Sequence, residues 1–342
     1  MDKKLIEEDE HFEKGCTYCH GGDDSQQDKD LAHKNREKRP SQNLKVCEEC
    51  HEQIVATYSK SLHYTTIGQR NRVVERFSDA ETKIFDKEVF EKSCRVCHAS
   101  CGDCHVKSPQ ISGISIGLIQ GHRFVKKNEG KTCAFCHGGR VYPEFAGEYG
   151  GSPDVHYEKG MMCMDCHNKR ELHGDGKMYQ VKEEVRDRPS CRDCHKMGNE
   201  AKLTAQIAHL KHQDKVSCYG CHASAEYRNC YSCHLGGGST AKPGFMLGLS
   251  PKNKKLVTTL RLIPTVRDSF KSKGIRMEKF DHLPNYWDTP AHNIKKRTER
   301  TRFCDACHEE GKGFLTKGML IENGSRANME LIYNPKSIPI HK

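Results

Sequence analysis

The sequence has little apolar material for a folded chain of its length. Only 35% of its 342 residues are hydrophobic, it has a single tryptophan, and its mean hydropathy is −0.82. A composition of this kind is typical of disordered proteins, because such chains cannot bury enough apolar surface to fold. If this chain folds, something other than its own side chains is expected to form much of its core.

Long hydrophobic runs are also missing. No stretch approaches the roughly 18 apolar residues of a membrane-spanning helix, and the most apolar run, residues 111–119, is interrupted by glycine and serine. The N-terminal residues 1–8 lack the apolar region of a signal peptide. The sequence therefore predicts no transmembrane segment.

Cysteine, by contrast, is abundant and strictly ordered. All 20 cysteines form pairs separated by two residues, a histidine follows each pair directly, and none is left over for a disulfide. The ten C-x-x-C-H motifs are Cys16, Cys19, His20; Cys47, Cys50, His51; Cys94, Cys97, His98; Cys101, Cys104, His105; Cys133, Cys136, His137; Cys163, Cys166, His167; Cys191, Cys194, His195; Cys218, Cys221, His222; Cys230, Cys233, His234; and Cys304, Cys307, His308.

This spacing is the one by which c-type haem is attached to a protein chain. The two thiols add to the two vinyl groups of one porphyrin, and the adjacent imidazole becomes the proximal iron ligand. Zinc sites also use C-x-x-C pairs, but they do not require a histidine directly after each pair. The motifs therefore predict ten covalent haems. The expected fold is mostly irregular coil with short α-helices and few strands, wrapped around a closely packed chain of haems.

The formal charge of +10 would otherwise suggest a nucleic-acid or lipid partner. Each ferric haem with two propionates and neutral imidazole ligands contributes about −1, so ten haems bring the oxidised protein close to neutrality. We interpret the lysine and arginine excess as propionate neutralisation and expect no nucleic-acid binding.

The sixth ligand of each iron separates electron carriers from enzymes. Ten further histidines would give every haem two imidazoles, and the sequence has eleven: His11, His33, His63, His122, His156, His173, His209, His212, His282, His292 and His341. His209 and His212 are three residues apart, so they are expected to share a helix face and to serve two haems. Which histidine is surplus stays open. The methionines at 161, 162 and 164 are interpreted as packing around porphyrins.

Two stretches lack haem motifs. In residues 52–93 a helix is expected after Ser78 or Asp79, with apolar positions at 84, 85, 89 and 90. Residues 235–303 begin with a glycine-rich loop at 236–238 and contain a predicted strand at 256–263. We expect a nine-haem array in residues 1–240 and a C-terminal lobe with the tenth haem in 241–342, together forming one continuous unit.

The ten motifs and four local signatures resemble the multihaem c-type cytochromes of anaerobic metal- and mineral-respiring microbes. The signatures are the double motifs at 94–105 and 218–234, Leu-His-Gly-Asp-Gly at 172–176, and Thr-Pro-Ala-His at 289–292. The resemblance implies a closely spaced, mainly bis-histidine haem chain in the periplasm or at the cell surface. Some members polymerise into extracellular filaments in which a histidine of one subunit ligates a haem of the next, and the histidines near both termini, His11 and His341, are similar to that arrangement.

These features predict an electron conduit without substrate chemistry. The expected location is extracytoplasmic, at the cell surface or outside the cell, with the periplasm as the alternative; the numbering is then expected to begin after removal of an export signal. Expected partners are further copies of the chain, redox proteins, and acceptors such as metal oxides. The alternatives are a multihaem reductase of the nitrite, hydroxylamine or tetrathionate type, a soluble periplasmic shuttle, and a subunit of a quinol-oxidising complex.

Overall fold

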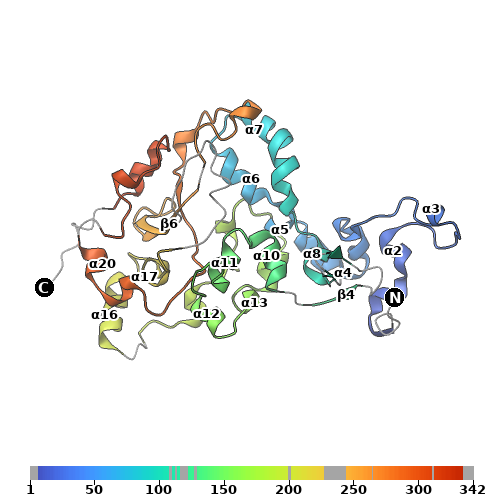
Figure 1. The fold of residues 1–342 in the computed structure, drawn as a ribbon, viewed down its shortest axis with the longest axis horizontal. Coiled ribbons are helices and arrows are strands. Elements are labelled where there is room, and N and C mark those ends of the chain that lie inside the picture. Colours follow the sequence, from blue (N-terminus) through green and yellow to red (C-terminus); the bar gives the residue numbers. More distant parts are fainter. Residues whose placement is uncertain are drawn as a thin grey trace. The chain divides into compact units, whose positions relative to one another are not determined.

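The computed structural model describes residues 7–107, 110–111, 114–115, 122–126, 129–198, 202–226, 244–263, 265–309 and 312–333. The chain divides into two compact units (Figure 1). Unit 1 comprises Met1–Gly68, Cys97–Cys133 and His167–Asp187, and unit 2 comprises Gln69–Val96, Ala134–Cys166 and Arg188–Lys342. The units interleave along the chain, so their bounds differ from the expected division after residue 240, which stays a prediction.

Unit 1 consists of short helices and very short strands. Its helical segments are η1 (Glu10–Lys14), α2 (Cys16–His20), α3 (Lys29–Ala32), η2 (Pro40–Gln42), α4 (Lys45–Tyr58), α5 (Leu62–Thr65), α8 (Cys101–His105), α14 (Lys169–His173) and η5 (Lys182–Glu184). Two antiparallel pairs join β1 (Val106–Lys107) to β4 (Arg123–Phe124) and β2 (Gln110–Ile111) to β3 (Ile114–Ser115).

Unit 2 contains more and longer elements. They are α7 (Asp79–Phe85), η3 (Asp86–Cys94), α11 (Val141–Ala146), α12 (Val155–Glu158), α13 (Cys163–Cys166), α15 (Cys191–Cys194), α16 (Leu203–His212), α17 (Cys218–His222), β5 (Met246–Leu249), β6 (Val257–Leu262), η7 (Lys271–Lys273), η8 (Phe280–His282), β7 (Tyr286–Asp288), α19 (Glu299–Arg302), α20 (Asp305–His308), η9 (Lys317–Met319) and η10 (Arg326–Leu331). Three segments extend across unit bounds: α6 (Ile67–Val74), η4 (Arg95–Cys97) and α10 (Lys131–His137).

The expectation of short helices and few strands is confirmed, although about 48% of the chain is helical. No helix among the described residues is long and apolar enough to cross a membrane.

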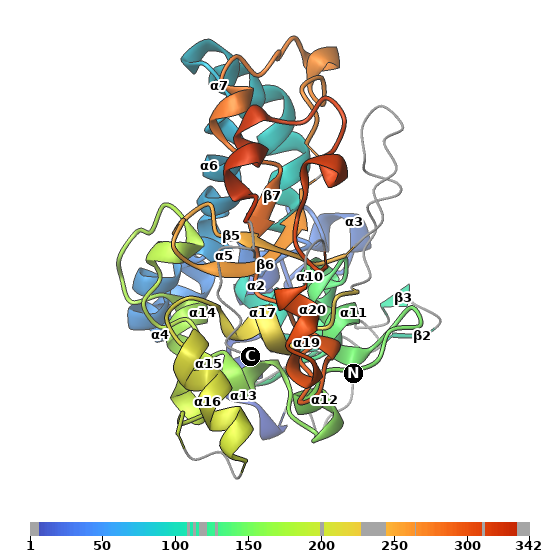
Figure 2. The same ribbon diagram turned by 90° about the vertical axis from the view of Figure 1, so that its left-hand side faces the viewer.

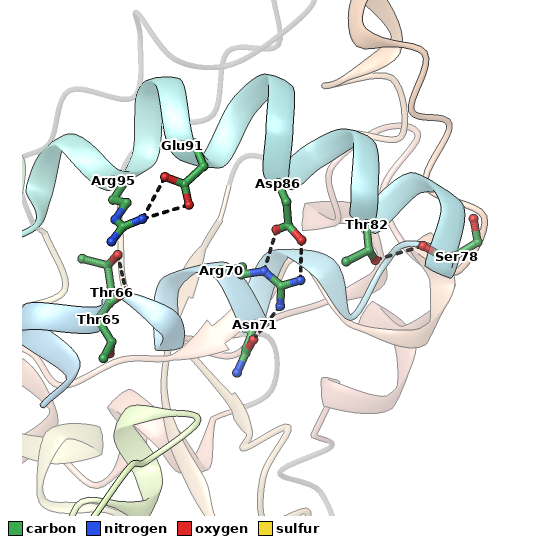
Figure 3. Close-up of polar contacts among 9 residues, drawn as sticks. All are labelled: Thr65, Thr66, Arg70, Asn71, Ser78, Thr82, Asp86, Glu91 and Arg95. Carbon is green, nitrogen blue, oxygen red and sulfur yellow. Dashed lines mark hydrogen bonds and ion pairs between the residues drawn. The ribbon is translucent and has the colours of Figure 1, made fainter. Parts of the chain in front are cut away.

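The helix expected after Ser78 is present. Ser78 caps α7 by accepting from the Glu81 amide, and the Glu81 side chain accepts from the Ser78 amide in return, which satisfies two backbone donors at the helix start. Figure 3 shows that α7 continues directly into the π-helix η3. In the same view the Arg70 side chain of α6 donates two hydrogen bonds, of 2.5 and 2.7 Å, to the Asp86 carboxylate.

The expected strand at 256–263 is also present, as β6. Its β-branched residues pack well on a pleated surface, and it forms the centre of the antiparallel sheet β5-β6-β7 (Figure 2). Leu260 and Leu262 of β6 are buried with Tyr286 of β7 and with Leu315 and Leu331 from the chain that follows.

The two motif-free stretches share a hydrophobic core. Phe77, Phe85 and Phe90 from the first stretch pack with three buried residues of the second, Ile275, Met277 and Phe280. The Phe77 and Phe85 rings meet edge-on with their centroids 5.2 Å apart. Of the four apolar positions at helical spacing, Phe85 and Phe90 are buried in this core and Val89 packs against it, whereas Ile84 is 37% exposed.

Candidate functional site

Nine of the ten C-x-x-C-H motifs lie within the described residues, and each lies on or at the end of a helical turn. Helical geometry places residues i, i+3 and i+4 on one face, so both thiols and the imidazole of a motif point the same way. This local arrangement suits attachment of a flat ligand by two thiols with the imidazole reaching toward its centre. The ninth motif, at 230–234, lies outside the described residues.

Six motif histidines each face a second histidine that lies outside the ten motifs. The ring-centroid distances are 6.1 Å for His11–His51, 5.9 Å for His20–His122, 5.9 Å for His105–His173, 5.9 Å for His156–His195, 6.2 Å for His209–His222 and 6.0 Å for His212–His308. Three pairs belong to unit 1 and three to unit 2. Each pair joins one motif histidine to one of the eleven others.

This repeated spacing fits a metal ion between the two rings. A first-row transition metal lies about 2 Å from an imidazole nitrogen, and the ring centre lies about 1 Å further away, so two imidazoles on opposite sides of one metal have centroids about 6 Å apart. Direct contact between stacked rings would allow a closer approach. The six centroid distances are therefore those expected if each pair of imidazoles held one metal ion.

The second ring nitrogen of many of these histidines is already engaged. Nδ1 lies within hydrogen-bond distance of a backbone carbonyl oxygen in six cases: His20 with Glu37 (2.8 Å), His33 with Lys29 (2.7 Å), His98 with Tyr64 (2.5 Å), His105 with Val125 (2.7 Å), His212 with Ala208 (2.7 Å) and His222 with Lys295 (3.0 Å). An Nδ1–H donor leaves Nε2 as the nitrogen that can bind a metal, and it fixes the orientation of the ring.

Three further histidines meet a carboxylate instead. His11 Nδ1 lies 2.7 Å from Asp9, His156 Nδ1 lies 2.8 Å from Asp154, and His167 Nδ1 lies 2.7 Å from Glu171. Carboxylate–histidine pairs of this kind orient metal ligands and raise their basicity.

The His173 site shows how the local sequence positions a ring. Burial lowers the pKa of His173, and the nearby His105 lowers it further, which favours the neutral form that binds metals. Helix α14 ends at Gly174 with φ +80°, and a Cβ there would lie 3.0 Å from the Thr57 carbonyl oxygen. Glycine is therefore required for the turn that brings α14 against α4.

Thiols of different motifs also lie close together within each unit. In unit 1 Cys47 and Cys101 share a hydrogen bond, which raises the pKa of Cys101; burial raises the pKa of Cys19, and Cys47 adds to that rise. The second motif is thus adjacent to both the first and the fourth.

Unit 2 shows a similar series. A hydrogen bond to Cys191 lowers the pKa of Cys218, and burial followed by the nearby Cys221 raises the pKa of Cys307. Burial also raises the pKa of Cys166, and Cys194 adds to it. The sixth, seventh, eighth and tenth motifs therefore have cysteines near one another in that order.

Helix α16 contributes one histidine to each of two pairs. His209 faces His222 of α17, and His212 faces His308 of α20. The three elements lie together in Figures 1 and 2. The expectation that His209 and His212 share one helix is met by α16, which extends from Leu203 to His212.

One extended segment in unit 2 supports several of these histidines. The Glu144 carboxylate is buried, binds Arg140 at 2.6 and 2.8 Å, and accepts a 3.0 Å hydrogen bond from the His292 amide. Two residues later, the Ile294 amide donates to the buried Asp154 carboxylate at 2.6 Å. The adjacent Lys295 carbonyl is the Nδ1 partner of His222, so this short segment braces two histidine pairs.

The remaining expected ligands are placed less completely. His63 lies on α5, where its carbonyl accepts from the Ala99 amide next to the third motif. His33 and His282 are exposed, and neither ring faces a motif histidine within the described part of the chain. His11 faces His51 of its own chain, and the ligation of another copy's haem by a terminal histidine stays a prediction. His341 and the loop at 236–238 lie outside the described residues.

Groups of three or more His, Cys, Asp or Glu side chains that could hold a metal ion are not found in the described ranges. The arrangement is one of histidine pairs beside paired thiols.

The sequence analysis did not identify the groups that orient the rings. Carbonyl partners leave no sequence signal, because any residue can provide one. The two aspartates do have one: outside the motifs, aspartate stands two residues before histidine only at Asp9–His11 and Asp154–His156.

Comparisons of the chain with protein-family models, with curated proteins and with solved structures gave no match.

Proposed function

We propose that the protein is an electron-transfer protein that holds ten covalent c-type haems, mainly with two histidine ligands each. The observation that carries the proposal is the set of six histidine pairs with centroid distances of 5.9–6.2 Å, each including one motif histidine. The bound haems would supply reversible one-electron chemistry. The chain's contribution would be to attach them through paired thiols and to supply two imidazoles to each iron.

Two ligands per iron favour conduction over catalysis. An iron with two imidazoles has no open position for a substrate, so it can exchange electrons but cannot bind nitrite or hydroxylamine. The hydrogen bonds at Nδ1 hold the rings in fixed orientations. Contacts between thiols of different motifs support close spacing of neighbouring haems, as in the Cys47–Cys101 and Cys191–Cys218 contacts.

Mass spectrometry of the intact native protein and EPR of its oxidised form test this proposal. We expect a mass equal to the 38.9 kDa chain plus ten haems, and only low-spin ferric signals. Fewer haems would contradict the motif assignment. A high-spin ferric signal equal to one haem per chain would favour the alternative, a multihaem reductase with one open site.

We further propose that the protein works outside the cytoplasm and assembles into a conducting polymer of its own copies. The exposed His33 supports this: its Nδ1 is held by the Lys29 carbonyl as in several of the paired histidines, which orients Nε2 to bind a haem iron of another copy. Negative-stain electron microscopy of the native protein is the test. Uniform thin filaments that the His33→Ala variant fails to form would support the polymer, and discrete particles would favour a soluble shuttle.

A further inference from the structure

In two of the six histidine pairs, an aspartate binds both the backbone amide and the ring of one histidine. Asp9 caps η1 and Asp154 caps α12, and each accepts from the backbone amide of the histidine two residues later, at 3.1 and 2.8 Å. The same oxygen lies 2.7 Å from Nδ1 of His11 and 2.8 Å from Nδ1 of His156. The cap therefore fixes both the helix start and the ring.

The neighbouring pairs use a neutral acceptor instead. In unit 1 the first and fourth motifs have His20 and His105 bonded to carbonyl oxygens at 2.8 and 2.7 Å. In unit 2 the eighth motif has His222 bonded to a carbonyl oxygen at 3.0 Å. In unit 1 the ionised acceptor at the second motif thus stands between two neutral ones, whereas the sixth motif, whose His167 lies 2.7 Å from Glu171, and the seventh motif both have ionised acceptors.

The difference has an electrostatic consequence. A carboxylate that accepts from Nδ1–H makes the imidazole a stronger donor to the metal, and its negative charge favours the more positive state of that metal. Both effects stabilise the oxidised form. Asp154 is 2% exposed, so water screens its charge poorly.

We infer that Asp9 and Asp154 are positioning residues that lower the potentials of the His11/His51 and His156/His195 sites below those of neighbouring sites whose histidines bind carbonyl oxygens. The inference rests on the proposed function. Because Cys47 lies near both Cys19 and Cys101, the low site of unit 1 stands between two sites with carbonyl-bonded histidines. In a partly oxidised protein the missing electron then resides preferentially at the second motif rather than at the first or fourth, and at the seventh rather than at the eighth.

The sharpest test is Asp9→Asn in the full holoprotein. Asparagine is as good a helix cap as aspartate and retains an oxygen acceptor for His11, so the substitution removes the charge with little change of shape. Potentiometric titration followed by visible and EPR spectroscopy should show one low-potential haem whose reduction equilibrium shifts about tenfold toward the reduced form, about 59 mV for a one-electron couple. The g-values of one low-spin signal should change with it.

Asp28→Asn is the matched control. Asp28 is an exposed helix cap in unit 1, accepts from the amides of Asp30 and Leu31, and makes no hydrogen bond to an imidazole among the described residues, whereas the Asp9 cap is half-buried. It removes the same charge, so a shift equal to that of Asp9→Asn would overturn the inference. Unchanged potentials in Asp9→Asn would overturn it as well.

Asp154→Asn extends the test to unit 2 and should raise a second low potential. Asp154 also binds the Ile294 amide, so this variant is checked for its haem number before titration. If it does not fold, Asp9→Asn alone still decides the inference. Ten low-spin haems with unaltered potentials would refute the inference only, whereas missing or high-spin haems in the wild-type protein would refute the proposed function.

Discussion

The two units differ most in what fills their interiors. Within the described residues, Val55 and Tyr58 are the buried apolar side chains of unit 1, whereas unit 2 has eighteen. The four hydrophobic clusters found in this part of the chain all belong to unit 2. Unit 1 nevertheless contains three of the six histidine pairs. A chain segment with two buried apolar residues cannot offset the entropy of its own ordering.

The comparison indicates two sources of stability in one chain. The motif-free stretches of unit 2 build a protein core around Phe77, Phe85, Met277 and Phe280, which does not depend on a cofactor. Unit 1 would obtain its core from the proposed porphyrins. The low apolar content of the sequence therefore reflects unit 1 and the motif regions more than the motif-free residues of unit 2.

The largest expected effect comes from making the full chain without haem attachment. Unit 1 should then lose its structure, while the β5-β6-β7 sheet of unit 2 stays folded. Hydrogen exchange followed by mass spectrometry measures this: amides of α4 should exchange rapidly, and those of β6 should stay protected. Equal protection of both elements would break the comparison, because unit 1 would then have a core that does not need haem.

Phe85→Ala should strongly destabilise unit 2. Phe85 is 1% exposed in the shared core, and removing a buried phenylalanine ring costs about 3–5 kcal/mol. The neighbour Ile84 offers a matched control, because it lies on the same helix but is 37% exposed; Ile84→Ala should change the free energy of unfolding by no more than about 0.5 kcal/mol. Denaturant unfolding of both variants measures the contrast, and equal costs would contradict the assigned core.

Glu81→Gln should have a smaller effect that depends on pH. Burial raises the pKa of Glu81, but hydrogen bonds from the Ser78, Glu278 and Arg276 amides outweigh it and hold the pKa below its usual value of 4.5. The stability contributed by the ionised form is therefore present above pH 4.5 and is lost as the pH falls through the lower folded-state pKa. At pH 7 the variant should lose about 1–3 kcal/mol.

The control for this variant is Glu91→Gln, which removes an exposed ion pair with Arg95 and should cost about 0.5 kcal/mol or less. Unfolding curves at pH 7 and pH 4 distinguish the two. A Glu81→Gln variant as stable as the wild type at pH 7 would show that the tie between α7 and residues 276–278 contributes little.

Local chemistry was readable from the sequence, and long-range pairing was not. The motifs, the Ser78 cap and the β-branched strand at 257–262 depend on neighbouring residues, so their spacing specifies them. The partner of each motif histidine does not: His20 meets His122 and His212 meets His308, across about a hundred residues of chain in each case. Nothing in the sequence indicated that the two motif-free stretches pack together, because an apolar residue does not specify which other apolar residues it will contact.

Helix α16 limits how this sequence can change over time. His209 and His212 serve two different partners from one rigid helix, and each added residue in a helix rotates everything after it by about 100°. A single insertion between them would turn one ring away from its partner. Length variation among descendants of this chain should therefore spare the ten residues of α16.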